Sequence, residues 1–225
     1  MTTTPPRKDE QERELAHQRA LMVERHVAAR GIKDERVLQA MRDVPRHKFV
    51  PQVVAAKAYG AGALPIGAKQ TISQPYIVAR MIELLELRGN EKVLEIGTGT
   101  GYQAVVLSKL CAKVFTIERV NELALRAAEL FRELKLHNAS VKVFDGTYGW
   151  SDQAPFDRII VAAAAPEIPD PLVQQLARTG RMVIPIGPAG NQRLARVTRV
   201  GTGVKIEDCG GAEFVPLVGR FGWRE

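Results

Sequence analysis

The chain has 225 residues, of which 45% are hydrophobic, and a formal net charge of +7. Its length and apolar content suffice for one sizeable core, and no apolar stretch approaches the roughly 20 residues of a membrane-spanning helix. Two cysteines are too few for a disulfide framework, and four scattered histidines show no metal-ligand spacing, so we expect no metal cofactor. The excess charge permits nucleic-acid binding, but acids are interleaved with the basic residues, as on a solvated surface.

The N-terminal part of the chain is predicted to be a polar tail followed by helices. Residues 1–14 lack the apolar core of a signal peptide and resemble a solvated, disordered tail, so we expect a cytoplasmic protein. Apolar residues at helical spacing predict a helix over residues 15–30, which Gly31 ends, and a second helix that Asp34 caps. A short helix over residues 53–58 follows. These helices precede every predicted strand, so they form an extension beside the sheet.

A long segment without regular periodicity, residues 59–74, comes next. It is rich in glycine and proline, and we interpret it as a loop, because loops of this length tend to be lids or binding loops. Pro75 suits the first turn of the following helix, with Ser73 or Gln74 at or beside its cap. The N-terminus of that helix is a source of backbone N–H groups that can bind an anion.

Residues 93–102, VLEIGTGTGY, are typical of a buried strand, a glycine turn and the start of a helix. Three alternate glycines leave backbone N–H groups uncovered, so a ligand can lie against the turn. The spacing G-x-G-x-G departs from the G-x-G-x-x-G of dinucleotide sites. A phosphate-cradling turn and a turn over a nucleoside without phosphate both remain open. A carboxylate at Glu95 would repel a pyrophosphate, and it favours a ligand with an ammonium or sulfonium group.

From Lys92 onward, strands alternate with helices, which predicts a parallel sheet covered on both faces. Further strands are expected at residues 113–118, 141–144, 158–161 and 181–186. Residues 193–200 and 204–209 flank a Gly-Thr-Gly turn and predict an antiparallel hairpin.

No linker is rich enough in flexible residues to split the chain, so we interpret residues 15–225 as a single domain. Within it, residues 15–90 form a helical cap with a substrate loop, and residues 91–225 form the sheet core.

Acidic residues end three successive strands: Glu95, Glu118 and Asp145. In an open α/β sheet the ligand binds outside the carboxyl ends of the strands, so these carboxylates are expected at one crevice. Glu118 lies about twenty residues after the glycine turn, where an acid suits a ribose diol, and Asp145 could accept from the amino group of adenine. Together they describe a pocket for an adenosine without phosphates, and S-adenosylmethionine fits that description.

Four stretches of the sequence resemble the protein-L-isoaspartate O-methyltransferase family, and the likeness runs from about Gly31 to Leu217. They are LPIG with QTISQP (residues 64–67 and 70–75), VLEIGTGTGY (93–102), PEIP (166–169) and FVPL (214–217). Many methyltransferases share the glycine motif, whereas the Thr-Ile-Ser-Gln-Pro segment is specific to this family. The resemblance implies an α/β fold: a doubly wound, Rossmann-like, seven-stranded methyltransferase sheet with an N-terminal helical extension.

The resemblance also implies an activity. S-adenosylmethionine would donate a methyl group to the α-carboxylate of an L-isoaspartyl residue in a damaged protein or peptide. The ester would then collapse to a succinimide that reopens partly to normal aspartate. The family's active-site serine corresponds to Ser73, and its cofactor residues correspond to Thr71, Ile72, Glu95, Gly97, Thr98, Gly99, Glu118, Asp145 and Gly146.

The chemistry implied for this site needs few residues. A carboxylate is already ionised at neutral pH, so no general base is required. Ser73 would orient that carboxylate through a hydrogen bond, although a serine in this position can also be a plain helix cap. The expected partners are isoaspartyl proteins and peptides, and we expect a monomer that binds neither nucleic acid nor membrane.

Some residues depart from the family pattern, and other functions stay open. Phe144 stands where the family often has glycine, and Ala162 where threonine is common.

One alternative function is that of an RNA or small-molecule methyltransferase on the same fold, motivated by the positive charge. An aromatic content of only 6%, without clusters, argues against RNA. The other is a nucleoside-binding or protein-interaction module without activity, against which the intact glycine turn and acids argue.

Overall fold

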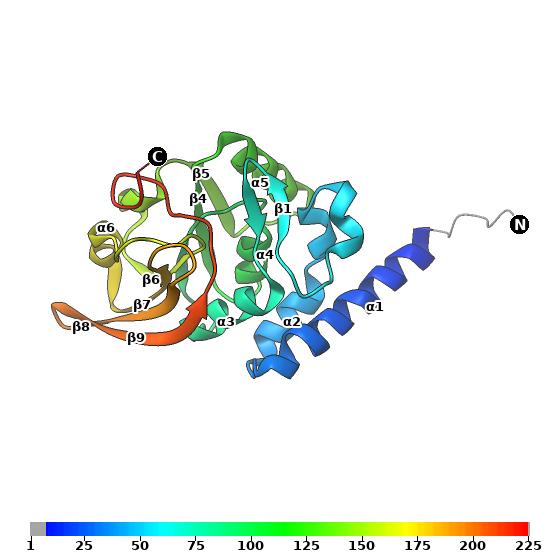
Figure 1. Ribbon diagram of the computed structural model, residues 1–225, viewed down its shortest axis with the longest axis horizontal. Coiled ribbons are helices and arrows are strands. Elements are labelled where there is room, and N and C mark those ends of the chain that lie inside the picture. Colours follow the sequence, from blue (N-terminus) through cyan, green and yellow to red (C-terminus); the bar gives the residue numbers. More distant parts are fainter. Residues whose placement is uncertain (1–7, 225) are drawn as a thin grey trace, which may run out of the picture.

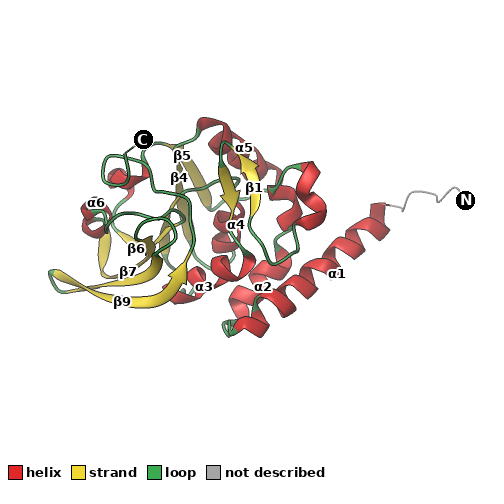
Figure 2. Cartoon of the chain, viewed as in Figure 1, coloured by secondary structure: helices red, strands yellow, loops and turns green. Residues whose placement is uncertain are grey.

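The computed structural model describes residues 8–224, and its centre is a seven-stranded sheet (Figures 1 and 2). Its strands are β3 (Lys92–Ile96), β4 (Lys113–Glu118), β5 (Ala139–Val143), β6 (Phe156–Val161), β7 (Leu176–Ile186), β8 (Gln192–Val200) and β9 (Gly203–Ala212). They lie in the order β5-β4-β3-β6-β7-β8-β9, with β8 and β9 antiparallel to their neighbours. The predicted seven-stranded sheet and its terminal hairpin are confirmed. The strand order reverses between β3 and β6, which is where open α/β sheets bind ligands.

Helices and loops cover the two faces of the sheet (Figure 2). The α-helices are α1 (Lys8–His26), α2 (Glu35–Asp43), α3 (Pro75–Leu85), α4 (Tyr102–Ser108), α5 (Asn121–Glu133) and α6 (Asp170–Gln174). Short 3₁₀ helices are η1 (Ala28–Arg30), η2 (Arg46–Phe49), η3 (Gln52–Lys57), η4 (Gly146–Tyr148) and η5 (Ser151–Gln153). Helices α1 to α5 pack in one hydrophobic cluster with Val93, while Leu94 and Ile96 join a second cluster with α6. Successive side chains of β3 therefore serve opposite faces.

The start of α1 differs from the prediction. The helix begins at Lys8, so residues 8–14 are helical rather than part of a disordered tail, and residues 1–7 lie outside the described part of the chain. Asp9 and Glu10 stand in the first turn, where negative charge stabilises a helix N-terminus. The first turns of α1 extend beyond the body of the protein and carry no apolar face, so apolar periodicity cannot reveal them (Figure 1). No helix within residues 8–224 is long and apolar enough to cross a membrane.

The segment predicted to be a loop contains a small antiparallel sheet. Strands β1 (Leu64–Gly67) and β2 (Gln70–Ile72) pair with each other, and Ala68 and Lys69 make the turn between them with positive φ values of 49° and 57°. Turns of this kind normally carry Asn or Gly, so Ala-Lys gives no sequence signal for a hairpin. The hairpin places Ile66 of β1 against the glycine turn that follows β3.

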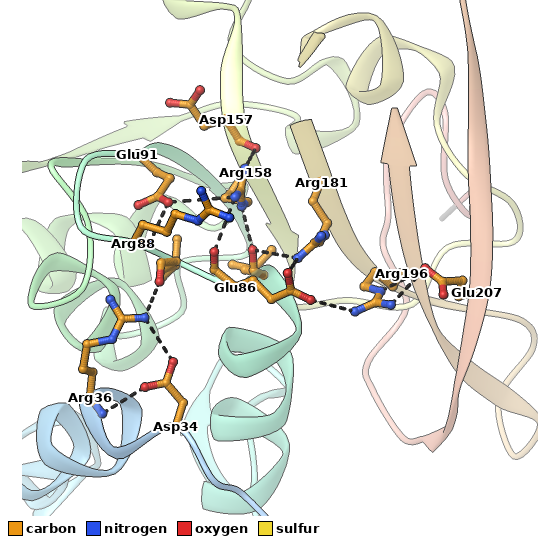
Figure 3. Close-up of polar contacts among 12 residues, drawn as sticks. Asp34, Arg36, Glu86, Arg88, Glu91, Asp157, Arg158, Arg181, Arg196 and Glu207 are labelled. Atoms are coloured by element: carbon orange, nitrogen blue, oxygen red, sulfur yellow. Dashed lines mark hydrogen bonds and ion pairs between the residues drawn. The ribbon is translucent and has the colours of Figure 1, made fainter. Parts of the chain in front are cut away.

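An arginine cluster, Arg158, Arg181 and Arg196, fixes the C-terminal end of α3 to the sheet (Figure 3). Nε of Arg158, from β6, donates to the carbonyl of Leu85 at 2.6 Å. Arg181 from β7 and Arg196 from β8 pair with the carboxylate of Glu86 at 2.7 and 3.2 Å. Cations are favourable at a helix C-terminus, where carbonyl groups lack partners within the helix. Three neighbouring strands thus hold one end of α3, and its other end begins two residues after Ser73.

We predict that Arg158→Met lowers the free energy of unfolding by about 1–3 kcal/mol, because the carbonyls of Leu85 and Glu86 lose a partly buried, charged donor. Arg193→Met is a matched control, since Arg193 pairs with Asp208 in full contact with solvent and should leave stability nearly unchanged. Urea unfolding of the three proteins measures the difference. Equal losses in both variants would mean that the cluster does not hold α3.

Candidate functional site

A cleft of about 970 Å³, counting its open mouth, lies at the carboxyl ends of β3, β4 and β6. Its lining includes residues 70–73, 96–100, 117–120 and 215–218. The cleft therefore sits at the reversal of strand order, where open α/β sheets bind ligands.

The glycine turn forms one side of this cleft. Gly97, Gly99 and Gly101 have positive φ values of 90°, 54° and 91°, a conformation that other residues adopt rarely. At Gly101 a Cβ would lie 2.6 Å from the ring of Phe131 in α5, so α4 and α5 can pack here only around a glycine. Gly97 and Gly99 line the cleft and present bare backbone to it.

Glu118, at the end of β4, holds the glycine turn and also lines the cleft. Its Oε2 accepts a hydrogen bond from the amide of Gly99 at 2.8 Å, and its Oε1 accepts from the amide of Val120 at 2.9 Å. A carboxylate has about four acceptor positions, so both oxygens can accept further bonds from a ligand. This arrangement suits the two hydroxyls of a ribose.

Strand β2 and the residue that follows it bring Thr71, Ile72 and Ser73 to the same cleft. The N-cap of α3 is Gln74, and no side chain caps the helix, so Ser73 is not a helix cap. Within residues 8–224 the Ser73 hydroxyl has no hydrogen-bond partner, while its carbonyl accepts from Arg46. The hydroxyl and the uncapped first turn of α3 are therefore free to bind an anion.

Glu95 is placed differently from the expectation that it faces a cationic ligand. Its side chain is fully buried and does not line the cleft. In β3 it shares a face with Val93, so it points beneath α4 instead of toward the cleft. There its Oε1 accepts from Nε2 of Gln103 at 3.0 Å, and its Oε2 accepts from Oγ1 of Thr116 at 2.5 Å.

Two short hydrogen-bond paths nevertheless connect Glu95 to the cleft. Gln103 lines the cleft directly, and Oγ1 of Thr116 also lies 2.6 Å from Oγ1 of Thr98, another lining residue. Burial raises the pKa of Glu95 from 4.5 to about 8, against the effect of its two hydrogen bonds and with a smaller contribution from Glu118. A cation in the cleft would favour the ionised form, so Glu95 can respond to ligand charge without touching the ligand.

Asp145 is also placed differently from the expectation that it contacts adenine. Its Oδ1 accepts from the amide and hydroxyl of Thr147 at 2.9 and 2.7 Å, and its Oδ2 accepts from the amide of Arg220 at 2.8 Å. The carboxylate therefore caps η4 and anchors the C-terminal segment, while the adjacent Gly146 lines the cleft.

The sequence prediction missed part of the lining. Residues 215–218 close one side of the cleft, and Tyr102 and Gln103 line it from the start of α4. The FVPL stretch was recognisable as a motif, but nothing in its composition indicates contact with a ligand. Of the two unusual residues, Ala162 lines the cleft, and Phe144 packs instead against Tyr148, with tilted rings whose centroids are 5.8 Å apart.

Comparison with known proteins places this architecture in a family. The family model described as Protein-L-isoaspartate(D-aspartate) O-methyltransferase matches residues 17–222. The chain belongs to this family. A protein-L-isoaspartate O-methyltransferase of Geobacter metallireducens is 54% identical over 206 residues, which cover 91% of this chain and 95% of that protein. One of Desulfosudis oleivorans is 49% identical over 217 residues, which cover 96% and 98%.

Solved structures agree with the fold. A protein-L-isoaspartate O-methyltransferase matches with a TM-score of 0.82 at 24% identity, covering 92% of this chain and 67% of that one. A Plasmodium falciparum protein described by the same name, in complex with S-adenosyl-L-homocysteine, matches with a TM-score of 0.76 at 25% identity, covering 88% and 96%.

We predict that Glu95→Gln makes stability less dependent on pH. Between about pH 4.5 and pH 8 the folded protein keeps the Glu95 proton and the unfolded chain does not, so this residue lowers stability as the pH rises. Glutamine removes that titration, so the Tm of the variant should fall less than that of the wild type from about pH 5 to pH 8. Calorimetric scans of the two ligand-free proteins at several pH values measure Tm. Plots of Tm against pH that run parallel for the two proteins would contradict a protonated Glu95.

Proposed function

We propose that the protein transfers a methyl group from S-adenosylmethionine to the α-carboxylate of L-isoaspartyl residues in damaged proteins and peptides, which initiates their repair. The observation that carries this proposal is the position of Ser73. In a chain that belongs to the protein-L-isoaspartate O-methyltransferase family, the family-specific Thr-Ile-Ser-Gln-Pro segment lines the same cleft as the glycine turn. Relatives about half identical over nine-tenths of this chain carry the corresponding name.

The groups that line the cleft suit S-adenosylmethionine. Glu118 offers acceptors for a ribose diol, and Gly97 and Gly99 present backbone without side chains. The residues that would hold the cofactor directly are Thr71, Ile72, Gly97, Thr98, Gly99, Glu118 and Gly146. Glu95 and Asp145 would act indirectly, Glu95 through Gln103 and Thr98 and Asp145 by anchoring the C-terminal segment. When bound, the cofactor supplies a methyl group already activated by its sulfonium charge.

The residues around Ser73 bind and orient the acceptor carboxylate. At neutral pH that carboxylate is ionised, so none of the lining residues has to act as a general base. The Ser73 hydroxyl donates to one carboxylate oxygen, and the backbone N–H groups in the first turn of α3 add favourable dipoles. The remaining contribution is alignment of the two reactants and exclusion of water by the hairpin and residues 215–218.

We further propose that residues 15–225 act as one domain, as a monomer in the cytoplasm, on proteins and not on nucleic acid. The helices before the sheet share a hydrophobic cluster with α3, α4 and α5, which supports a single folding unit. The low aromatic content supports a protein substrate over RNA.

A pair of peptides tests the substrate. The protein should transfer labelled methyl groups from S-adenosylmethionine to a peptide with one L-isoaspartyl residue and leave its aspartyl twin unlabelled. Scintillation counting of the separated peptides measures the transfer. Equal labelling of the twins, labelling of neither, or labelling of transfer RNA instead would refute the proposed function.

A substitution tests the role of Ser73. Ser73→Ala should lower kcat/KM for the isoaspartyl peptide roughly tenfold to hundredfold, as expected for loss of a hydrogen bond to a charged group. The Kd of S-adenosylhomocysteine, measured by calorimetry, should stay within about twofold of the wild type, because the hydroxyl serves the acceptor. Ser151→Ala, at an exposed serine on η5, is the control. If Ser73→Ala lost cofactor affinity instead, the assigned role would be wrong.

A further inference from the structure

Arg46 is a fully buried positive charge without an anionic partner. The side chain lies at the start of η2 and is 0% exposed. Burial lowers its pKa, but a guanidinium stays protonated in proteins, so the charge remains. Besides burial, the groups that influence this pKa are the hydroxyls of Tyr102 and Tyr59, and within residues 8–224 Arg46 forms no ion pair with a carboxylate.

The contacts of Arg46 place its charge directly behind one wall of the cleft. Its Nη2 donates to the carbonyl of Ser73 at 2.8 Å, and its Nε donates to the carbonyl of Ala58 at 3.0 Å. The guanidinium carbon also lies 4.9 Å from the centroid of the Tyr102 ring. Ser73 and Tyr102 both line the cleft, so only the cleft wall separates the cation from a ligand there.

One donor of Arg46 remains unused. Nη1 is buried and no described acceptor lies within hydrogen-bond distance of it; the neighbouring Tyr102 hydroxyl, also buried and without a partner at that distance, is close enough to raise the pKa of Arg46. Proteins rarely bury a charge that is neither paired nor fully hydrogen-bonded, because leaving it uncompensated is costly. No carboxylate among the described residues compensates this charge, so an anion that binds in the cleft can do so. The acceptor carboxylate at Ser73 is such an anion.

We propose that Arg46 is a positioning residue that makes the site select a negatively charged carboxylate at Ser73. This inference rests on the proposed function, since it assigns that carboxylate to Ser73. The bond to its carbonyl fixes the backbone of Ser73, the bond to Ala58 holds the guanidinium in place, and the positive charge favours an anion on the cleft side of the wall. The same charge distinguishes substrate from product. Methylation replaces the anion by a neutral ester, which loses the attraction and is released more readily.

The experiment compares two peptides that differ only in charge. One carries an L-isoaspartyl residue with its free α-carboxylate, and its twin carries the neutral α-carboxamide at the same place. Their Kd values are measured by calorimetry in the presence of saturating S-adenosylhomocysteine, so that no turnover occurs. The wild type should bind the carboxylate at least about tenfold more tightly than the carboxamide.

Two substitutions of Arg46 separate its charge from its structural bonds. Arg46→Met should reduce the preference for the carboxylate peptide to about twofold or less, mainly by raising the Kd of that peptide. The Kd of S-adenosylhomocysteine should stay unchanged. Arg46→Lys keeps the charge and should keep the preference within about threefold of the wild type. Arg36→Met is the control: it removes the same charge and a guanidinium–carbonyl bond to Leu87, at the other end of α3, and should leave the preference unchanged.

Each failure has a distinct result. If Arg46→Met weakens both peptides equally, Arg46 only ties the chain together, and the inference is overturned. It is also overturned if the lysine variant loses the preference as the methionine variant does. Should the methionine variant not fold, as judged by circular dichroism, the wild type and the lysine variant decide, and a wild type without charge preference overturns the inference. A wild type that neither binds nor methylates the isoaspartyl peptide refutes the proposed function itself.

Discussion

The hydrogen bond between the amide of Gly99 and the carboxylate of Glu118 is the contact on which the rest of the site depends. It joins the turn after β3 to the end of the neighbouring strand β4, and the other wall of the cleft is built against this turn. Ile66 of the hairpin packs on Gly99, and the hydroxyl of Thr100 donates to the carbonyl of Phe49 in η2 at 2.6 Å. The cofactor side and the acceptor side of the cleft are thus positioned by one short stretch of backbone.

Most of the sheet could be predicted because its strands are apolar runs that end in acids or glycines, signals that depend on neighbouring residues alone. The N-terminal hairpin could not, since its turn uses Ala68 and Lys69 in a conformation that these residues seldom adopt. The side of β3 to which the Glu95 side chain points could not be predicted either. Both faces of β3 are buried, so alternation does not show which side faces α4 and which faces the ligand.

Asp145 shows a second limit of sequence reasoning. An acid at the end of a strand is expected at the ligand, but this one is satisfied by Thr147 and by the amide of Arg220, 75 positions further along the chain. Contacts over such distances leave no local pattern. The same limit applies to Arg46, whose partner carbonyls belong to Ala58 and Ser73 and whose sequence neighbours suggest only a basic surface turn. The resemblance to the family singled out Ser73 and Glu118 as candidate site residues, but only the structure reveals the contacts that support them.

The arginine cluster and Ser73 lie at opposite ends of α3, so the length of this helix sets the distance between them. Glu86 is held at one end by three strands, and Ser73 stands two residues before Pro75 at the other, with eleven helical residues between them. Each residue of an α-helix adds about 1.5 Å and about 100° of rotation. A single insertion or deletion in α3 would therefore swing the serine away from the cleft, whereas the exposed turn of the β8–β9 hairpin can vary freely. In evolution the length of this helix should change almost never, and its seven buried residues should tolerate few substitutions because they pack in the core.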